Sequence, residues 1–167
     1  MATAKSSRKR IRRRVGDVVC IPLGDEQYGF GRVLQEPLFA FYDFRNARVP
    51  PISKIVESRV IFKIWVMNHA VTSGRWPVVG SAPLEPELAV EPEFCKEDPI
   101  TGALTIYHQT KERPAALDEC DKLEAAAVWE PHHVEGRLRD YFAGVPNATY
   151  EWLRPGRIPG GPSTKRH

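Results

Sequence analysis

The stretch "YGFGRVLQEPLFAFYDF", residues 28–44, constrains the fold of this chain more than any other feature. It holds two runs rich in aromatic and β-branched side chains, residues 28–34 and 38–44, with only the loop 35–37 between them. Strand-forming runs joined by a three-residue loop are typical of a β-hairpin. The sequence therefore predicts two antiparallel strands at this position.

The loop length also predicts the register of the hairpin. If Leu34 faces Leu38, then Gly31 lies opposite Phe41, and the absent side chain of Gly31 leaves room for the Phe41 ring. The opposite face then carries a ladder of aromatic cross-strand neighbours. The four rings of this predicted aromatic face are Tyr28, Phe30, Tyr42 and Phe44.

The Gly-x-Gly pattern of Gly29 and Gly31 also raises the alternative of a phosphate-binding loop. Such a loop lies between a strand and a helix and has a third glycine three residues later. Position 34 is leucine, and a second strand is predicted to follow. The glycines are therefore expected to be structural.

Other segments complete the pattern of strands first and helices last. Gly144 follows the apolar stripe of the second C-terminal helix and is expected to end it. The order of elements predicts an α+β fold, with a small curled antiparallel sheet or a partly open barrel and C-terminal helices. We expect strands within residues 18–21, 59–68, 73–81 and 103–109, a short helix within 50–58, and helices over 117–130 and 132–144.

Charge divides the chain into three parts. Residues 1–14 hold 7 basic residues and residues 154–167 hold 4, without an acid in either part, and we expect both tails to be disordered. The single globular domain predicted over 15–153 holds the remaining 13 basic residues (24 − 7 − 4) and all 21 acidic residues, a net charge of −8. The domain is therefore acidic although the whole chain is basic.

The acidic residues concentrate in the proline-rich segment 84–98, with a second pair at the turn before residue 28. Such a charge run is often a solvated loop. The functional interpretation is a docking surface for a basic partner. The residues of this predicted acidic surface are Asp25, Glu26, Glu85, Glu87, Glu91, Glu93, Glu97 and Asp98.

Nucleic-acid binding is the main alternative. A lysine- and arginine-rich arm neutralises phosphates whatever the base sequence, and the predicted aromatic face offers rings on which bases could stack. The negative charge of the domain opposes this function.

Two histidines suggest chemistry only weakly. His132 and Glu135 have the i, i+3 spacing of metal ligands on a helix, but a zinc site needs more ligands, and we expect both side chains to face solvent. His69 and Ser73 lie near each other after a strand, without the pattern of a nucleophile elbow. We therefore expect no catalytic residues, no metal and no cofactor.

Compartment is inferred from cysteines and apolar runs. Cys20, Cys95 and Cys120 are odd in number and lack Cys-x-x-Cys spacing, so we expect thiols in a reducing cytoplasm. No apolar run is long enough to span a bilayer or to form a signal peptide after the basic arm. The oligomeric state stays open.

Four stretches together resemble the immunity protein 26 family of bacterial polymorphic toxin systems. They are "GDVVCIPLGDEQYGFGRVL", "FAFYDF", "RVIFKIWVMNHAVTSGRW" and "LEAAAVWEPHHVEGRLRDYFAG", between about Val15 and about Ala143. The resemblance implies a mostly β domain that neutralises a toxin encoded by a neighbouring gene, by binding the toxin without catalysis. It supplies no functional residues, so the predicted acidic surface depends on the charge pattern alone.

Overall fold

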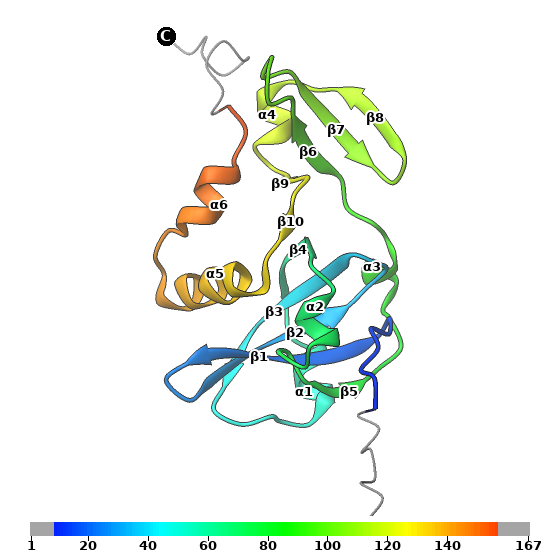
Figure 1. Cartoon of the computed structure of the whole chain (residues 1–167), viewed down its shortest axis with the longest axis vertical. Coiled ribbons are helices and arrows are strands. Elements are labelled where there is room, and N and C mark those ends of the chain that lie inside the picture. The colour runs from blue at the N-terminus through cyan, green and yellow to red at the C-terminus, as the bar shows by residue number, and fades with distance from the viewer. Residues whose placement is uncertain (1–8, 157–167) are drawn as a thin grey trace, which may run out of the picture.

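The computed structural model describes residues 9–156 and consists of two open β-sheets and six short or medium helices (Figure 1). The first sheet has the strand order β10-β4-β3-β2-β1-β5 and the second has the order β8-β7-β6-β9. The strands of the first sheet are β1 (Asp17–Gly24), β2 (Gln27–Val33), β3 (Leu38–Asn46), β4 (Val60–Val66), β5 (Val78–Ser81) and β10 (Val128–Trp129). Those of the second are β6 (Phe94–Glu97), β7 (Leu104–His108), β8 (Lys111–Pro114) and β9 (Glu124–Ala125).

The helices lie between and after these strands. They are α1 (Ile52–Val56), α2 (His69–Thr72), α3 (Pro86–Ala89), α4 (Leu117–Cys120), α5 (Pro131–Ala143) and α6 (Ala148–Leu153). The predicted α+β class, with most strands in the N-terminal half, is confirmed. Each sheet is mixed because β10 pairs in parallel with β4, and β9 pairs in parallel with β6. None of the described helices is long and apolar enough to cross a membrane.

The predicted hairpin is formed by β2 and β3. The backbone N–H of Leu34 donates to the carbonyl of Leu38 at 3.0 Å, and Gly31 pairs with Phe41 as expected. The register then shifts beyond Gly31, so that Tyr28 pairs with Asn46 instead of Phe44. A bulge in this strand pair explains the difference, because an extra length of β3 lies opposite the glycines of β2.

A side chain at Gly31 is expected to destabilise this hairpin. A Cβ there would lie 3.2 Å from the Ala40 carbonyl oxygen and 3.3 Å from the Phe41 ring, which is tighter than most real Cβ contacts. We expect Gly31→Val to lower the free energy of unfolding by about 1–3 kcal/mol through overpacking. Urea denaturation measures this, with Gly136→Ala on an open helix surface as the control. An unchanged midpoint for Gly31→Val would contradict the register.

Both faces of the first sheet are buried in its centre. One face packs on α5 and α2, with Val19, Ile21, Phe39 and Trp76 among the buried residues of this core. The sequence explains where α5 begins and ends. Pro131 occupies its first turn, and Gly144 ends it in the left-handed conformation, with φ of 69°. α5 lies next to β1 in Figure 1, and the two elements are in contact.

The predicted aromatic face lies on the other side of this sheet and is covered by α1. Phe30 is 0% exposed and Tyr42 is 1% exposed, and Ile55 of α1 is buried with them. Tyr28 and Phe44 pack at the edge of the same cluster. Phe30 and Tyr42 therefore belong to a second core and cannot stack with bases, whereas Tyr28 and Phe44 are half-buried at its edge, so the predicted four-ring stacking face is wrong.

The region 117–130 is not the helix that its composition predicts. Only α4 is helical there, and the two-residue strands β9 and β10 follow it. β9 extends the second sheet and β10 extends the first, so this segment connects the two sheets. Pairing with strand edges outweighs the helix propensity of its alanines, a preference worth only tenths of a kcal/mol per residue.

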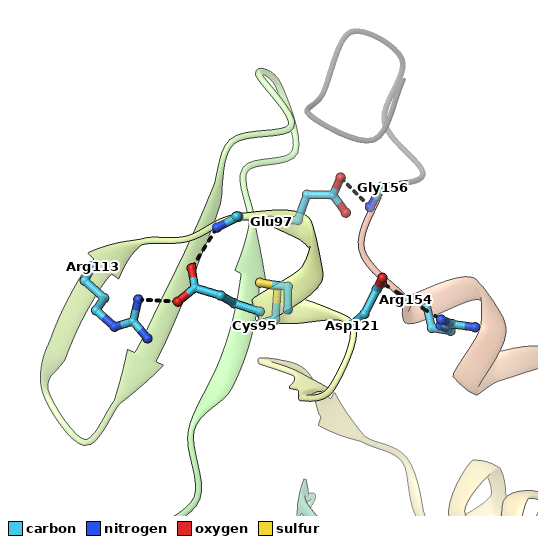
Figure 2. The surroundings of a disulfide bond; sticks show 9 residues. Cys95, Glu97, Arg113, Asp121, Arg154 and Gly156 are labelled. Atoms are coloured by element: carbon cyan, nitrogen blue, oxygen red, sulfur yellow. Dashed lines mark hydrogen bonds and ion pairs between the residues drawn. A yellow bond between two sulfur atoms is a disulfide. The ribbon is translucent and has the colours of Figure 1, made fainter. Parts of the chain in front are cut away.

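Cys95 and Cys120 form a disulfide, which corrects the expectation of three thiols. Their Cα atoms are 5.2 Å apart although 25 residues separate them in sequence. Figure 2 shows the bond between β6 and the end of α4, and Leu104 and Ile106 of β7 are buried beside it. The sequence does not indicate this pairing, because it depends on the antiparallel strands β6 and β7. They reverse the chain direction, so that α4, which holds Cys120, lies close to Cys95. Cys20 keeps a buried thiol, and burial raises its pKa.

The two tails are partly ordered. Residues 9–14 of the predicted disordered arm lie against the domain, where the Arg13 guanidinium donates to the Leu38 carbonyl at 2.7 Å. At the other end, the backbone N–H of Gly156 donates to Glu97, as Figure 2 shows. Residues 1–8 and 157–167 lie outside the described part of the chain, so their predicted disorder stays a prediction.

Candidate functional site

The segment between β5 and β6 carries most of the predicted acidic surface. α3 lies in the middle of this segment, and its Leu88 is buried against Leu34, Leu38 and Phe94. Leu88 and the partly buried Leu84, which packs on the same cluster, fix the segment to the sheet. Among the neighbouring glutamates, Glu87 and Glu93 are exposed, whereas Glu85 and Glu91 are half-buried.

Glu85, at the start of this segment, belongs to the network of a buried arginine. The Arg32 side chain is 0% exposed, and its Nη1 lies 3.5 Å from a carboxylate oxygen of Glu85, which is 40% exposed. Arg32 also donates to the carbonyls of Ala82 and Pro83, at 2.6 and 2.7 Å. Arg32 therefore holds the start of the acidic segment in place from inside the sheet.

Glu87, Glu91 and Glu93 are the acids of this segment whose carboxylates are not neutralised by a nearby cation. Glu87 and Glu93 are exposed, Glu91 is half-buried, and none of the three forms an ion pair with any residue between 9 and 156. Lys63 donates to the backbone carbonyl of Glu87 at 2.8 Å. Burial lowers the pKa of Lys63, and the nearby Glu87 charge opposes this shift.

Glu97 and Asp98 have local structural roles instead. Glu97 accepts the hydrogen bond from Gly156, and Asp98 accepts from the backbone N–H groups of Ile100 and Thr101 at 2.8 and 2.7 Å. These hydrogen bonds from Thr101 and Ile100 lower the pKa of Asp98. Both acids stabilise the end of β6 and the turn after it.

Asp25 and Glu26 form the turn between β1 and β2, both with positive φ, of 51° and 57°. Their side chains are exposed. In Figure 1 this turn extends to one side of the first sheet, while α3 lies at the opposite side. The predicted acidic surface is therefore divided into two separate sites, and the larger is the segment around α3.

Glu135 does not face solvent, which corrects the expectation for this residue. Its carboxylate accepts from Arg75 Nε at 2.7 Å, from Arg75 Nη2 at 2.9 Å and from the indole N–H of Trp76 at 2.9 Å. Burial raises the pKa of Glu135, but the hydrogen bonds from Arg75 and Trp76 outweigh it, so the pKa lies below the usual value. Both carboxylate oxygens of Glu135 accept hydrogen bonds from Arg75 or Trp76. The His132 ring packs on the His133 ring.

His69 and Ser73 are not arranged for catalysis. The His69 ring lies 3.1 Å from Glu130 in an exposed pair, and the Ser73 hydroxyl donates to the backbone carbonyl of His69 instead of its ring. Within residues 9–156 no cluster of three or more histidine, cysteine or carboxylate side chains could hold a metal ion.

Sequence analysis missed an apolar groove between β10 and α6. The groove has a volume of about 570 Å³ and is lined mainly by apolar side chains. Val128 and Trp152 on its rim are 48% and 74% exposed. The helix α6 itself was not predicted, although Asn147 before it is a capping residue and accepts from the Tyr150 N–H at 2.9 Å.

The C-terminal region also holds an unpredicted arginine cluster. Arg137 forms two hydrogen bonds with Glu124, at 3.0 and 2.6 Å. Its guanidinium lies over the rings of Phe62 and Tyr150, 3.8 and 4.4 Å from their centroids. These contacts connect α5 and α6 to β9 and β4, which is a structural role.

Comparisons with known proteins complete this picture. Neither the curated proteins nor the solved structures contain a match to the chain. Residues 14–103 match the family described as immunity protein 26, over more than half of the chain. The matched range includes the whole first sheet except β10, and all eight residues of the predicted acidic surface. This chain therefore belongs to the immunity protein 26 family.

Proposed function

We propose that this protein neutralises a cognate bacterial toxin by direct binding, and that the acidic segment 85–93 is the main contact surface. Membership of the immunity protein 26 family is the observation that carries the proposal. The matched residues contain this segment, whereas the apolar groove between β10 and α6 lies beyond residue 103. If toxin binding is common to the family, its contact surface is expected in the matched part of the chain.

Charge supports the choice of this segment. The domain 15–153 has a net charge of −8, and six of its 21 acids pair with arginine or lysine inside the domain. Glu87, Glu91 and Glu93 have no such pair. Their field is therefore available to steer a basic partner toward α3.

A toxin that attacks nucleic acid is the partner that this chemistry fits best. Such an enzyme binds phosphates in a basic cleft, and carboxylates on a fixed segment can occupy the same cleft. Leu88 and Arg32 hold the segment in one conformation, which reduces the entropy lost on binding. Inhibition in this form requires no catalytic residue, so the protein acts as a binding protein and not as an enzyme.

The proposed compartment is the bacterial cytoplasm, where a toxin would meet its target. Thiols are mostly reduced there. The Cys95–Cys120 disulfide is an exception to this rule, since stable disulfides are rare in the cytosol.

Salt and charge reversal test the contact surface. We expect the double substitution Glu87→Lys and Glu93→Lys to lower the association rate constant about tenfold at low salt, because charges outside the core mainly steer encounter. The measurement is surface plasmon resonance on the immobilised toxin domain encoded by the neighbouring gene, at ionic strengths from about 0.02 to 0.5 M, over which screening shortens the range of charges.

The matched control is Glu57→Lys with Asp118→Lys, which changes two exposed acids elsewhere by the same total charge. The control is expected to slow association only slightly. If both variants slow association equally, or if the rate does not depend on salt, segment 85–93 is not the contact surface. Reversal of Asp25 and Glu26 shows whether the separate turn contributes.

A further inference from the structure

Residues 9–14 contact the domain through alternate side chains. A Cβ on Gly74 would lie 3.3 Å from the end of the Ile11 side chain, so Ile11 lies against that turn. Arg13 donates to the Leu38 carbonyl and lies 4.9 Å from the centroid of the Phe39 ring. Ile11 and Arg13 therefore face the domain, and alternate facing is the pattern of an extended chain.

The four other residues of this segment are exposed. Lys9, Arg10, Arg12 and Arg14 line a groove of about 540 Å³ beside β5, the edge strand of the first sheet. None of these four cations forms an ion pair with a residue of the described chain, 9–156. The groove contains one acid, Asp17, which is only 9% exposed. The groove is thus a strongly basic surface on an otherwise acidic domain.

We propose that this basic strip, Lys9, Arg10, Arg12 and Arg14, binds the phosphate backbone of nucleic acid. In an extended segment, residues two apart are about 6.6 Å apart, so Arg10, Arg12 and Arg14 form a row suited to a polymer with a regularly repeated charge, and Lys9 adds a fourth charge at its start. Guanidinium groups bind phosphate oxygens through two parallel hydrogen bonds.

The lining of the groove also predicts the kind of binding. Besides the arm, it consists of Asp17, Val78, Gly80 and Ser81, without an aromatic ring on which a base could stack. Contacts therefore go to phosphates, and the binding is expected to ignore base sequence and to weaken steeply with salt. The groove reaches Ser81 at the end of β5, four residues before segment 85–93, but its cations are distinct from those acids, and its function does not depend on the proposed toxin contact.

Fluorescence anisotropy with labelled 20-nucleotide single-stranded and duplex DNA of mixed sequence tests the proposal. For the wild type we expect dissociation constants in the micromolar range at low salt, with little dependence on sequence. The variant Arg10→Gln, Arg12→Gln, Arg14→Gln is expected to bind at least tenfold more weakly. The slope of log K against log salt on duplex DNA should fall by about 2 to 3, since each phosphate contact contributes about 0.9.

The matched control removes three exposed cations that make no ion pair within residues 9–156, through Arg48→Gln, Lys54→Gln and Lys111→Gln. The control should keep the wild-type slope, and both variants should keep the wild-type melting temperature because the changed side chains are exposed. The proposal is overturned if the wild type does not bind DNA, or if both variants weaken binding equally. It is also overturned if polyglutamate of similar length competes as well as unlabelled DNA, since the strip would then recognise acidic protein.

Discussion

Replacing Arg32 with leucine is expected to lower the free energy of unfolding by about 3–5 kcal/mol, the usual cost of breaking a buried charged network. The guanidinium donates from Nε to the Gly16 carbonyl at 2.8 Å and from Nη1 to the Tyr42 hydroxyl at 3.0 Å, besides the carbonyls of Ala82 and Pro83. Leucine fills part of the volume but supplies no donor. Several buried acceptors then lose their hydrogen bonds, at about 1–3 kcal/mol each where water cannot replace them.

Urea denaturation followed by tryptophan fluorescence measures this effect, with Arg48→Leu as the control. Arg48 is exposed, so its replacement should change stability by less than about 0.5 kcal/mol. Arg32→Lys keeps the charge but not the forked geometry, and is expected to lie between the wild type and Arg32→Leu. A loss below 1 kcal/mol for Arg32→Leu would contradict the role of the network, and Arg32→Lys provides the measurement if the leucine variant does not fold.

The same residue shows what the sequence could and could not predict. The hairpin of β2 and β3 follows from local pattern, and Gly31 lies opposite Phe41 as predicted. Nothing in that pattern indicates that Arg32, in the middle of the hairpin, is buried. Its partners at positions 16 and 82–85 come from segments that only the folded sheet brings together.

The errors in the C-terminal half have a related cause. The segment 117–130 has good helix formers, yet two of its short pieces complete the edges of different sheets. The strand β6 lies in a proline-rich acidic segment whose composition predicts a loop. The disulfide of Cys95 could not be predicted without this strand. Local propensity is a weak preference, and contacts between distant segments decide such regions.

The acidic surface is predicted from composition, and its role in binding stays a prediction. Composition correctly indicates that Glu87 and Glu93 are exposed acids. It gives no information on which acids the fold uses for itself, as it uses Glu97 and Asp98, or on the distance between the turn at Asp25 and α3. These distinctions depend on hydrogen bonds that exist only in the folded chain.

Replacing Glu135 with alanine is expected to lower the free energy of unfolding by about 2–4 kcal/mol at neutral pH. Trp76 is 0% exposed, and the substitution leaves its indole N–H without the acceptor that Glu135 provides. The lost pair with Arg75 contributes less, because the Arg75 side chain is 46% exposed and solvent screens it. Glu130→Ala, which breaks the exposed pair with His69 near the start of the same helix, is the control and should cost under about 1 kcal/mol.

The pH dependence separates the charge of Glu135 from its packing. The folded pKa lies below the usual 4.5, so the carboxylate stabilises the fold above that value, and the stabilisation is lost as the pH falls through the folded pKa. The stability difference between the wild type and Glu135→Gln is therefore expected to be largest near pH 7 and to shrink as the pH falls below about 4.5. Urea midpoints at pH 7, 5, 4 and 3 provide the test. A difference that stays constant over this range would mean that the Glu135 charge does not contribute to stability, and that only the acceptor for Trp76 matters.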